Sequence, residues 1–184
     1  LCDCTGYRLD GTDTEPNMYV GTIINRSLAD TTDSVTGLGD VHALVNAIGE
    51  MRRVPREAGF IAIKVDDIAE VNARFGFDAG DRVLAESAAC LMDCSRGKGR
   101  LFRSTGPTFV ALFDDLDPEE TNAIAEEIER FLGSPVLIGS LEYQPPIRVA
   151  TLHLDAVDRQ PVSILNELKA LLKEASQVPG TKLD

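Results

Sequence analysis

One stretch decides the fold, Phe60–Asp81, which reads FIAIKVDDIAEVNARFGFDAGD. Its first part, Phe60–Val65, is apolar and rich in β-branched residues, so it predicts a buried central strand. The apolar spacing that follows predicts a short helix over Ile68–Arg74, ended by Gly76. A longer helix is expected over Asp81–Met92, where it opens directly after a second glycine. The stretch therefore predicts a strand followed by two helices.

Outward from this stretch, the pattern predicts one α+β domain. A preceding helix over Asp40–Met51 has apolar residues at helical spacing, with Asp40 placed to cap it. A strand hairpin, a helix, a strand and a last helix are expected after the central stretch. They are Arg100–Arg103 with Phe109–Phe113, Pro118–Leu132, Ile147–Leu154 and Pro161–Ala175. This order is that of a split βαββαβ core, which predicts a palm or ferredoxin-like sandwich: a central, mostly antiparallel β-sheet with flanking helices.

The chain begins with a separate small segment. Two strand-like runs, Gly6–Leu9 and Met18–Ile24, flank a turn-rich stretch and predict a β-hairpin. The expected division is residues 1–33 for the hairpin and its connector, and residues 34–184 for the main domain. Because an isolated hairpin is marginal in water, it is expected to pack on the main domain or on a partner chain, or to belong to a domain that has been cut away. Residue 1 is not Met, so we expect a piece of a longer parent chain.

The composition restricts the class of protein. The 184 residues, 43% of them hydrophobic, suffice for one full domain with a sizeable core. A net charge of −12 and a pI near 4.6 argue against nucleic acid as a partner, because that task usually requires a basic face. No apolar run reaches the roughly 18 residues of a membrane span. We therefore expect no membrane contact by this segment and a cytoplasmic location.

The cysteines and histidines do not predict a metal site. Cys90 and Cys94 lie one helical turn apart, while His42 and His153 are distant in the sequence. Zinc sites usually cluster such residues more tightly, so reduced thiols are expected. No metal and no cofactor are predicted.

Three local motifs resemble those of one protein family. Asp33–Leu38 is similar to its opening motif, Asp-x-Leu-Thr-Gly-Leu, and Arg103–Phe109 to its signature hairpin, Arg-x-Gly-Gly-Asp/Glu-Glu-Phe. The positions that match its nucleotide-binding segment are Asp66, Asn72, Gly76, Gly80 and Asp81. Residues 34–180 thus resemble the GGDEF family of diguanylate cyclases, which make cyclic di-GMP from GTP.

The metal-binding positions of the family are altered here. The resemblance places Lys64 and Pro107 where the family holds metal ions on GTP with acidic residues, and Thr108 at the next acidic position. Magnesium requires hard oxygen ligands, which lysine and the proline side chain do not supply. Because phosphoryl transfer depends on metal and charge stabilisation, we expect a degenerate cyclase that is not an enzyme and binds no magnesium. Pro107 also biases Gly106 towards an extended conformation.

Three residues match ligand-binding positions that are retained. The resemblance implies that Asn72 and Asp81 hydrogen-bond the guanine edge, and Arg103 is the arginine of the signature hairpin. GTP is therefore a candidate ligand. The alternative for Asn72 is a polar helix face, and for Asp81 a place in the first turn of a helix. Lys64 has two interpretations: a lysine reaching solvent, or an ammonium that contacts a phosphate without metal.

Two further resemblances concern regulation. The family's product-inhibition motif, Arg-x-x-Asp, corresponds to Arg96–Gly99, in which the Asp is lost, so binding of cyclic di-GMP is not expected there. Residues 1–33 resemble the final strands of a PAS sensor domain. The resemblance to these families implies a bacterial-type signalling protein.

Three hypotheses about function follow. The first is a catalytically inactive GGDEF-like signalling domain that acts as a relay, a dimerisation unit or a guanine-nucleotide sensor. Its partners would be a guanine nucleotide, a second copy in a homodimer, or other signalling domains of the parent chain. The second is an active or altered diguanylate cyclase that uses Asp66 and Asp67, and the third is a purely protein-binding domain.

Overall fold

The protein, seen in a computed structural model, contains two compact units, residues 1–30 and 31–184. The structure describes residues 2–9, 18–25, 31–54, 56–95, 97–132 and 134–182. In the first unit, β1 (Cys2–Leu9) pairs antiparallel with β2 (Met18–Asn25), as the sequence predicts. The turn of this hairpin and residues 26–30 of the connector lie outside the described residues.

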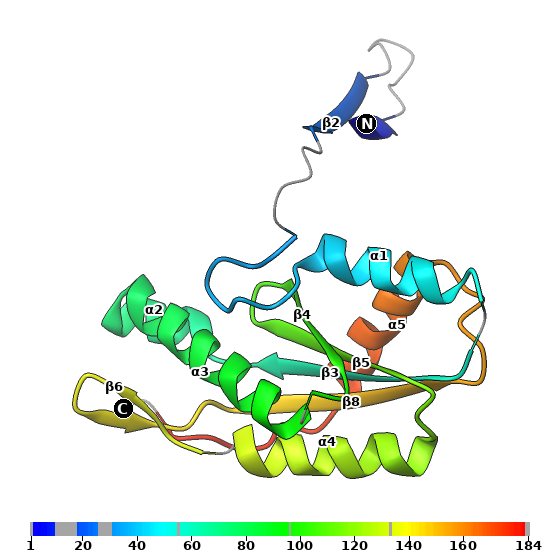
Figure 1. Cartoon of the computed structure of the whole chain (residues 1–184). Helices are drawn as coiled ribbons and strands as arrows, with labels where there is room; N and C mark the ends of the chain where they lie inside the picture. The colour runs from blue at the N-terminus through cyan, green and yellow to red at the C-terminus, as the bar shows by residue number, and fades with distance from the viewer. Residues whose placement is uncertain are drawn as a thin grey trace. The chain divides into compact units, whose positions relative to one another are not determined.

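The second unit is the α+β sandwich that the sequence predicts. Its four-stranded sheet has the order β4-β5-β3-β8, and every neighbouring pair is antiparallel (Figure 1). The elements are α1 (Val41–Met51), β3 (Ala58–Val65), α2 (Ile68–Phe75), α3 (Phe77–Ser95), β4 (Arg100–Thr105), β5 (Thr108–Asp114), α4 (Pro118–Leu132), β6 (Val136–Ile138), β7 (Leu141–Tyr143), β8 (Ile147–Leu154) and α5 (Pro161–Glu174).

The two faces of the sheet are covered by different helices. Along β3, Ile61 and Ile63 belong to a core shared with α2, α3 and α4, whereas Phe60 and Ala62 belong to a core shared with α1 and α5. Alternate side chains of a strand point to opposite faces. Because β3 is buried on both sides, its sequence is almost entirely apolar. Its one position that is not buried is Lys64, next to the last residue of the strand.

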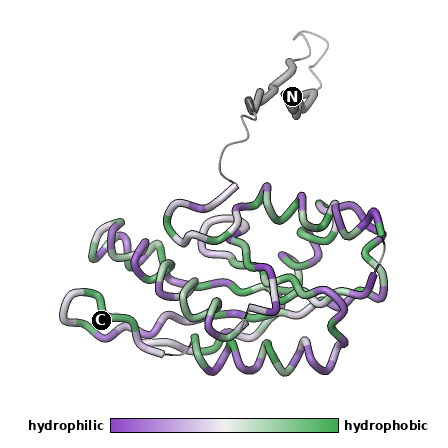
Figure 2. Tube along the Cα trace, viewed as in Figure 1, coloured by the Kyte–Doolittle hydropathy of each residue, from purple (hydrophilic) through white to green (hydrophobic). Residues whose placement is uncertain are grey.

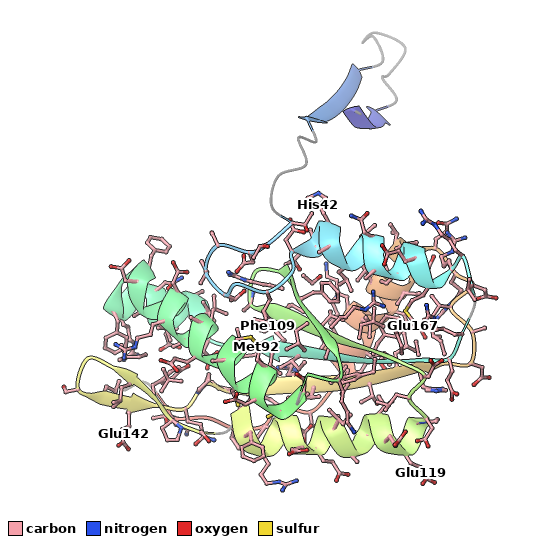
Figure 3. All side chains as sticks on the ribbon, in the orientation of Figure 1. His42, Met92, Phe109, Glu119, Glu142 and Glu167 are labelled. Atoms are coloured by element: carbon pink, nitrogen blue, oxygen red, sulfur yellow. The ribbon has the colours of Figure 1, made fainter. Side chains whose placement is uncertain are left out.

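Hydropathy follows these layers. In Figure 2 the helices alternate between hydrophilic and hydrophobic colours, as expected when one helix face packs on a sheet. Figure 3 shows Phe109 in the interior, whereas Glu119 and Glu142 project outward. Within the part of the chain that the structure describes, no helix is long and apolar enough to span a membrane.

One helix begins earlier than predicted. The start expected at Asp81 is wrong, because α3 begins at Phe77 and includes Gly80. The real break is at Gly76, which has φ +88° and ends α2 by donating its N–H to the carbonyl of Asn72. Gly80 is needed for another reason: a Cβ atom there would lie 2.0 Å from Oδ1 of Asn72. The glycine permits close helix packing instead of opening a helix.

A third hairpin, β6–β7, was not predicted from the sequence. Strands β6 and β7 pair antiparallel around Gly139, which has φ +63°. Each strand has three residues, which is too few for a period of two to be recognised. Tyr143 of β7 is fully buried and belongs to the same hydrophobic core as the buried apolar residues of α3.

Candidate functional site

The end of β3 is organised around a buried carboxylate. The side chain of Asp66, only 7% exposed, accepts from Nζ of Lys64 at 2.6 Å and from Nε of Arg148 at 2.8 Å. Nε2 of Gln177 donates to the same carboxylate at 2.7 Å. Burial alone would raise the pKa of Asp66, but the hydrogen bonds from Lys64, Arg148 and Gln177 outweigh it and lower the pKa. Asp66 is therefore held as an anion by two cations and an amide.

This network changes both interpretations of Lys64. Its side chain is 43% exposed, so it is accessible, yet its ammonium is paired with Asp66. A lysine that only reaches solvent would not make this pair. Equally, a phosphate would have to compete with an internal carboxylate for the same ammonium.

The tip of the β4–β5 hairpin closes against the same strand end. The register pairs Lys64 with Thr108, and Val65 N–H donates to the carbonyl oxygen of Pro107 at 3.0 Å. The expectation of an extended Gly106 is wrong, because this residue has φ +55°. A two-residue hairpin turn needs the left-handed region, and glycine supplies it without steric cost.

The residues present here do not fit a magnesium ion. Lys64 brings a cation to the position of a ligand, Pro107 has no side-chain oxygen, and Asp66 already accepts from three donors. Magnesium prefers near-octahedral oxygen ligation. Across the described ranges, no group of three or more His, Cys, Asp or Glu residues could hold a metal ion.

Arg103 joins two motifs that are distant in the sequence. Its Nη1 donates to both carboxylate oxygens of Asp33 at 3.0 and 3.2 Å, and its Nε donates to the carbonyl of Gly106 at 2.8 Å. Thr36 donates to Asp33 through its N–H and its hydroxyl. Arg103 thus links the hairpin turn to the opening motif through these hydrogen bonds. Within the described part of the chain, no hydrogen bond or ion pair connects it to Asn72 or Asp81.

Asn72 and Asp81 lie on neighbouring helices, α2 and α3. Oδ1 of Asn72 is buried without a hydrogen-bond partner in the described structure, and it packs against Gly80, next to Asp81. Asn72 as a whole is half-buried, so a polar helix face and a ligand-binding role both remain open for it. Asp81 is exposed and lies beyond the first turn of α3, where the acidic residue is Asp78. The first-turn interpretation of Asp81 is wrong.

The segment that resembles the product-inhibition motif is described only in part. Arg96 lies outside the described residues. A Cβ atom at Gly99 would lie 2.5 Å from the ring of Phe113, which is itself buried. Phe113 therefore leaves no room for the family's Asp at position 99 unless its ring shifts.

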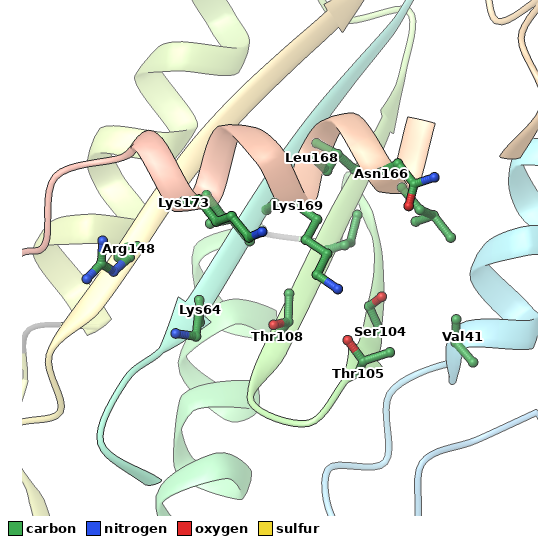
Figure 4. Close-up of a pocket in the computed structure, with 14 residues that line it drawn as sticks. Val41, Lys64, Ser104, Thr105, Thr108, Arg148, Asn166, Leu168, Lys169 and Lys173 are labelled. Atoms are coloured by element: carbon green, nitrogen blue, oxygen red, sulfur yellow. The ribbon is translucent and has the colours of Figure 1, made fainter. Parts of the chain in front are cut away.

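Sequence reasoning missed a pocket of about 600 Å³ between the sheet, α1 and α5. It contains four basic residues, shown with part of the lining in Figure 4: Lys64, Arg148, Lys169 and Lys173. Lys169 and Lys173 are one helical turn apart, so the signal in the sequence was a repeated lysine beside the apolar positions of the last helix.

Comparisons with known proteins cover most of the second unit. A family model described as "Diguanylate cyclase, GGDEF domain" matches residues 30–176. Diguanylate cyclase DgcS of Shewanella oneidensis is 29% identical over 84 residues, which are 44% of this chain and 28% of that protein.

Two solved structures from Pseudomonas aeruginosa share the fold. The diguanylate cyclase SiaD, in complex with its activator SiaC, aligns with a TM-score of 0.73 and 22% identity, over 79% of this chain and 58% of that chain. The FimX GGDEF domain aligns with a TM-score of 0.74 and 16% identity, over 80% of this chain and 94% of that chain. The chain thus spans less than two thirds of DgcS and of the SiaD chain.

Proposed function

Since the chain belongs to the diguanylate cyclase GGDEF domain family, we propose that it is a catalytically inactive member that acts as a signalling module. One observation carries the proposal: Nζ of Lys64 lies 2.6 Å from Oδ1 of Asp66. By resemblance, Lys64 stands where active relatives have a carboxylate for metal. An internal ion pair therefore takes the place of a metal–carboxylate contact.

The chemistry of phosphoryl transfer supports this proposal. Such reactions depend on positioning the phosphates and neutralising their charge, for which metal ions are the main device. Lys64, Pro107 and Thr108 together offer no carboxylate at the degenerate positions. The alternative of an altered cyclase needs Asp66 and Asp67 as ligands. Asp66 is buried and already bound by Lys64 and Arg148, which argues against it.

Guanine-nucleotide sensing is the role that the retained residues favour. Oδ1 of Asn72 is buried against Gly80 without a hydrogen-bond partner among the described residues, and Asp81 presents an exposed carboxylate from the neighbouring helix. A guanine edge offers N–H donors of the kind that a carboxylate accepts. In this proposal GTP binds as a ligand without magnesium. Arg103 stabilises the hairpin turn through its hydrogen bond to the carbonyl of Gly106.

We assign the N-terminal unit, residues 1–30, to the end of a PAS domain, the protein to the cytoplasm, and signal transfer to a homodimer or to other domains of a longer chain. The activator bound to SiaD illustrates that a protein of this fold can receive a protein signal. A domain that binds only protein partners is the alternative when no nucleotide binds.

Two measurements test the proposal. A thermal melt with GTP, run with magnesium and with EDTA, should show a stabilisation that survives EDTA; binding at a hundredfold excess over the dissociation constant adds about 2.7 kcal/mol. Chromatography of a long incubation with GTP and magnesium should show no cyclic di-GMP. Magnesium-dependent product would refute the inactive assignment, and no shift in either buffer would leave the protein-binding alternative.

A further inference from the structure

The pocket between α5 and the sheet has a divided lining. Its apolar wall is formed by α1, the sheet and one face of α5, and its polar wall by the β4–β5 hairpin and basic side chains. The apolar residues are Val41, Ala62, Val110, Leu165, Leu168 and Leu172. A pocket of about 600 Å³ lies within the range that holds small organic ligands.

Two of its four cationic side chains have no partner among the described residues. Lys64 and Arg148 share the carboxylate of Asp66, whereas the side chains of Lys169 and Lys173 make no ion pair or hydrogen bond with any residue that the structure describes. Like charges one turn apart on a helix repel each other. An anion between them would relieve this repulsion.

The hairpin adds hydrogen-bond donors opposite these lysines. Ser104, Thr105 and Thr108 line the pocket, and Figure 4 shows Lys169 extending from α5 towards their hydroxyls. Hydroxyl groups and ammonium groups together suit phosphate or carboxylate oxygens. The whole chain carries a net charge of −12, so this local collection of cations is the opposite of the average surface.

We infer that this pocket binds an amphipathic organic anion, with its phosphate or carboxylate group between Lys169, Lys173 and the hairpin hydroxyls. The apolar body of the ligand then packs on Leu165, Leu168 and Leu172. The site is separate from Asn72, because α5 covers the opposite face of the sheet from α2 and α3. The inference rests on lining residues other than Asn72 and Asp81, although Lys64 and Thr108 of this lining stand, by resemblance, at the family's metal-holding positions.

Isothermal titration calorimetry with simple probes tests this inference. Octyl phosphate and octanoate carry the two candidate head groups on the same apolar chain, inorganic phosphate has no apolar body, and octanol has no charge. We expect octyl phosphate, octanoate or both to bind, and the comparison of these two identifies the head group. Equal binding of octanol, equal binding of inorganic phosphate, or no binding by either octyl anion would each overturn the proposal.

Charge-matched variants locate the site. The double substitution Lys169→Glu with Lys173→Glu should weaken binding of the octyl anion by about tenfold or more. The control, Lys98→Glu with Lys182→Glu, changes the net charge equally at exposed residues outside the pocket lining and should leave binding unchanged. Equal loss in both variants would overturn the assignment to this pocket.

Two further variants complete the test. Ser104→Ala with Thr105→Val removes hydroxyls but no charge, so a folded protein with weakened binding is expected even if the lysine variant proves unstable. Unchanged affinity in this variant would overturn the role of the hydroxyls. Asn72→Ala should bind octyl anions normally, which separates failure here from failure of the nucleotide proposal.

Discussion

The guanidinium of Arg103 holds both carboxylate oxygens of Asp33, at 3.0 and 3.2 Å, across 70 residues of sequence. The same segment is attached by backbone bonds, since Arg103 N–H donates to the carbonyl of Gly39 at 2.8 Å. A Cβ atom at Gly39 would lie 2.7 Å from the ring of Phe102, so this approach requires glycine. The opening motif is therefore fixed to the edge strand β4, and the signature arginine has a structural role.

Breaking this pair should destabilise the domain. Arg103→Ala leaves Asp33 partly buried without its cation, and removing one partner of a charged hydrogen bond costs roughly 1–3 kcal/mol. Urea denaturation measures the change in the free energy of unfolding. The matched control is Arg74→Ala, which removes an exposed pair with Glu70 and should cost about 0.5 kcal/mol or less. Equal effects of the two substitutions would contradict the structural role.

Lowering the pH should reduce the stability of the folded domain, because Asp66 becomes protonated. Its pKa in the folded protein is below its ordinary value of 3.8, because hydrogen bonds from Lys64, Arg148 and Gln177 outweigh burial. A depressed pKa contributes stability that is fully present above pH 3.8 and is lost as pH falls through the folded value. We expect Asp66→Asn to be less stable at pH 7 and to lose less stability than the wild type between about pH 5 and pH 2. Thermal melts measure the midpoint of unfolding at each pH. If the midpoints of the wild type and of Asp66→Asn fall by the same amount as the pH is lowered, the prediction is wrong.

Restoring one carboxylate should not restore a cyclase. Lys64→Asp removes a cation from Asp66 and places a second carboxylate beside it, so we expect lower stability and no magnesium-dependent product from GTP. The triple variant Lys64→Asp with Pro107→Glu and Thr108→Glu supplies all three acidic positions. Only this triple variant should bind GTP more tightly with magnesium than without it. Calorimetry and nucleotide chromatography measure both effects. Lys64→Met, which removes the charge without adding a ligand, is the control; cyclic di-GMP from Lys64→Asp alone would contradict the argument.

Local patterns predicted most of the fold. The bounds of α4 and β8, Pro118–Leu132 and Ile147–Leu154, agree with the expected elements, because a proline at a helix start and a long apolar strand are strong local signals. The predicted start of α3 was wrong because Gly80 lies inside the helix, where it packs against Asn72. Short strands such as Val136–Ile138 have too little sequence to be recognised.

The site depends on contacts between distant residues. Asp66 meets Gln177 across 111 residues and Arg148 across 82, and no spacing in the sequence predicts such pairs. The resemblance identified Lys64 as a departure from the family, but the partner of its ammonium had to come from the structure. The same holds for the pocket beside α5, which needs the hairpin and the helix together.

A glycine substitution can test the nucleotide site without removing any of its polar groups. In Gly80→Ala the new methyl group would lie 2.0 Å from Oδ1 of Asn72, so the Asn72 side chain must rotate away. Because alanine favours a helix over glycine by roughly 0.5–1 kcal/mol, the cost of this rotation is offset, and the midpoint of unfolding should change little. The shift of that midpoint by GTP should nevertheless disappear, as it should in Asn72→Ala. The control is Gly49→Ala in α1, where a Cβ atom meets nothing within 4 Å: it should raise stability by about 0.5–1 kcal/mol and keep the GTP shift. If Gly80→Ala retains the full shift, the orientation of Asn72 does not matter for the ligand, and the assignment of the guanine edge to this residue fails.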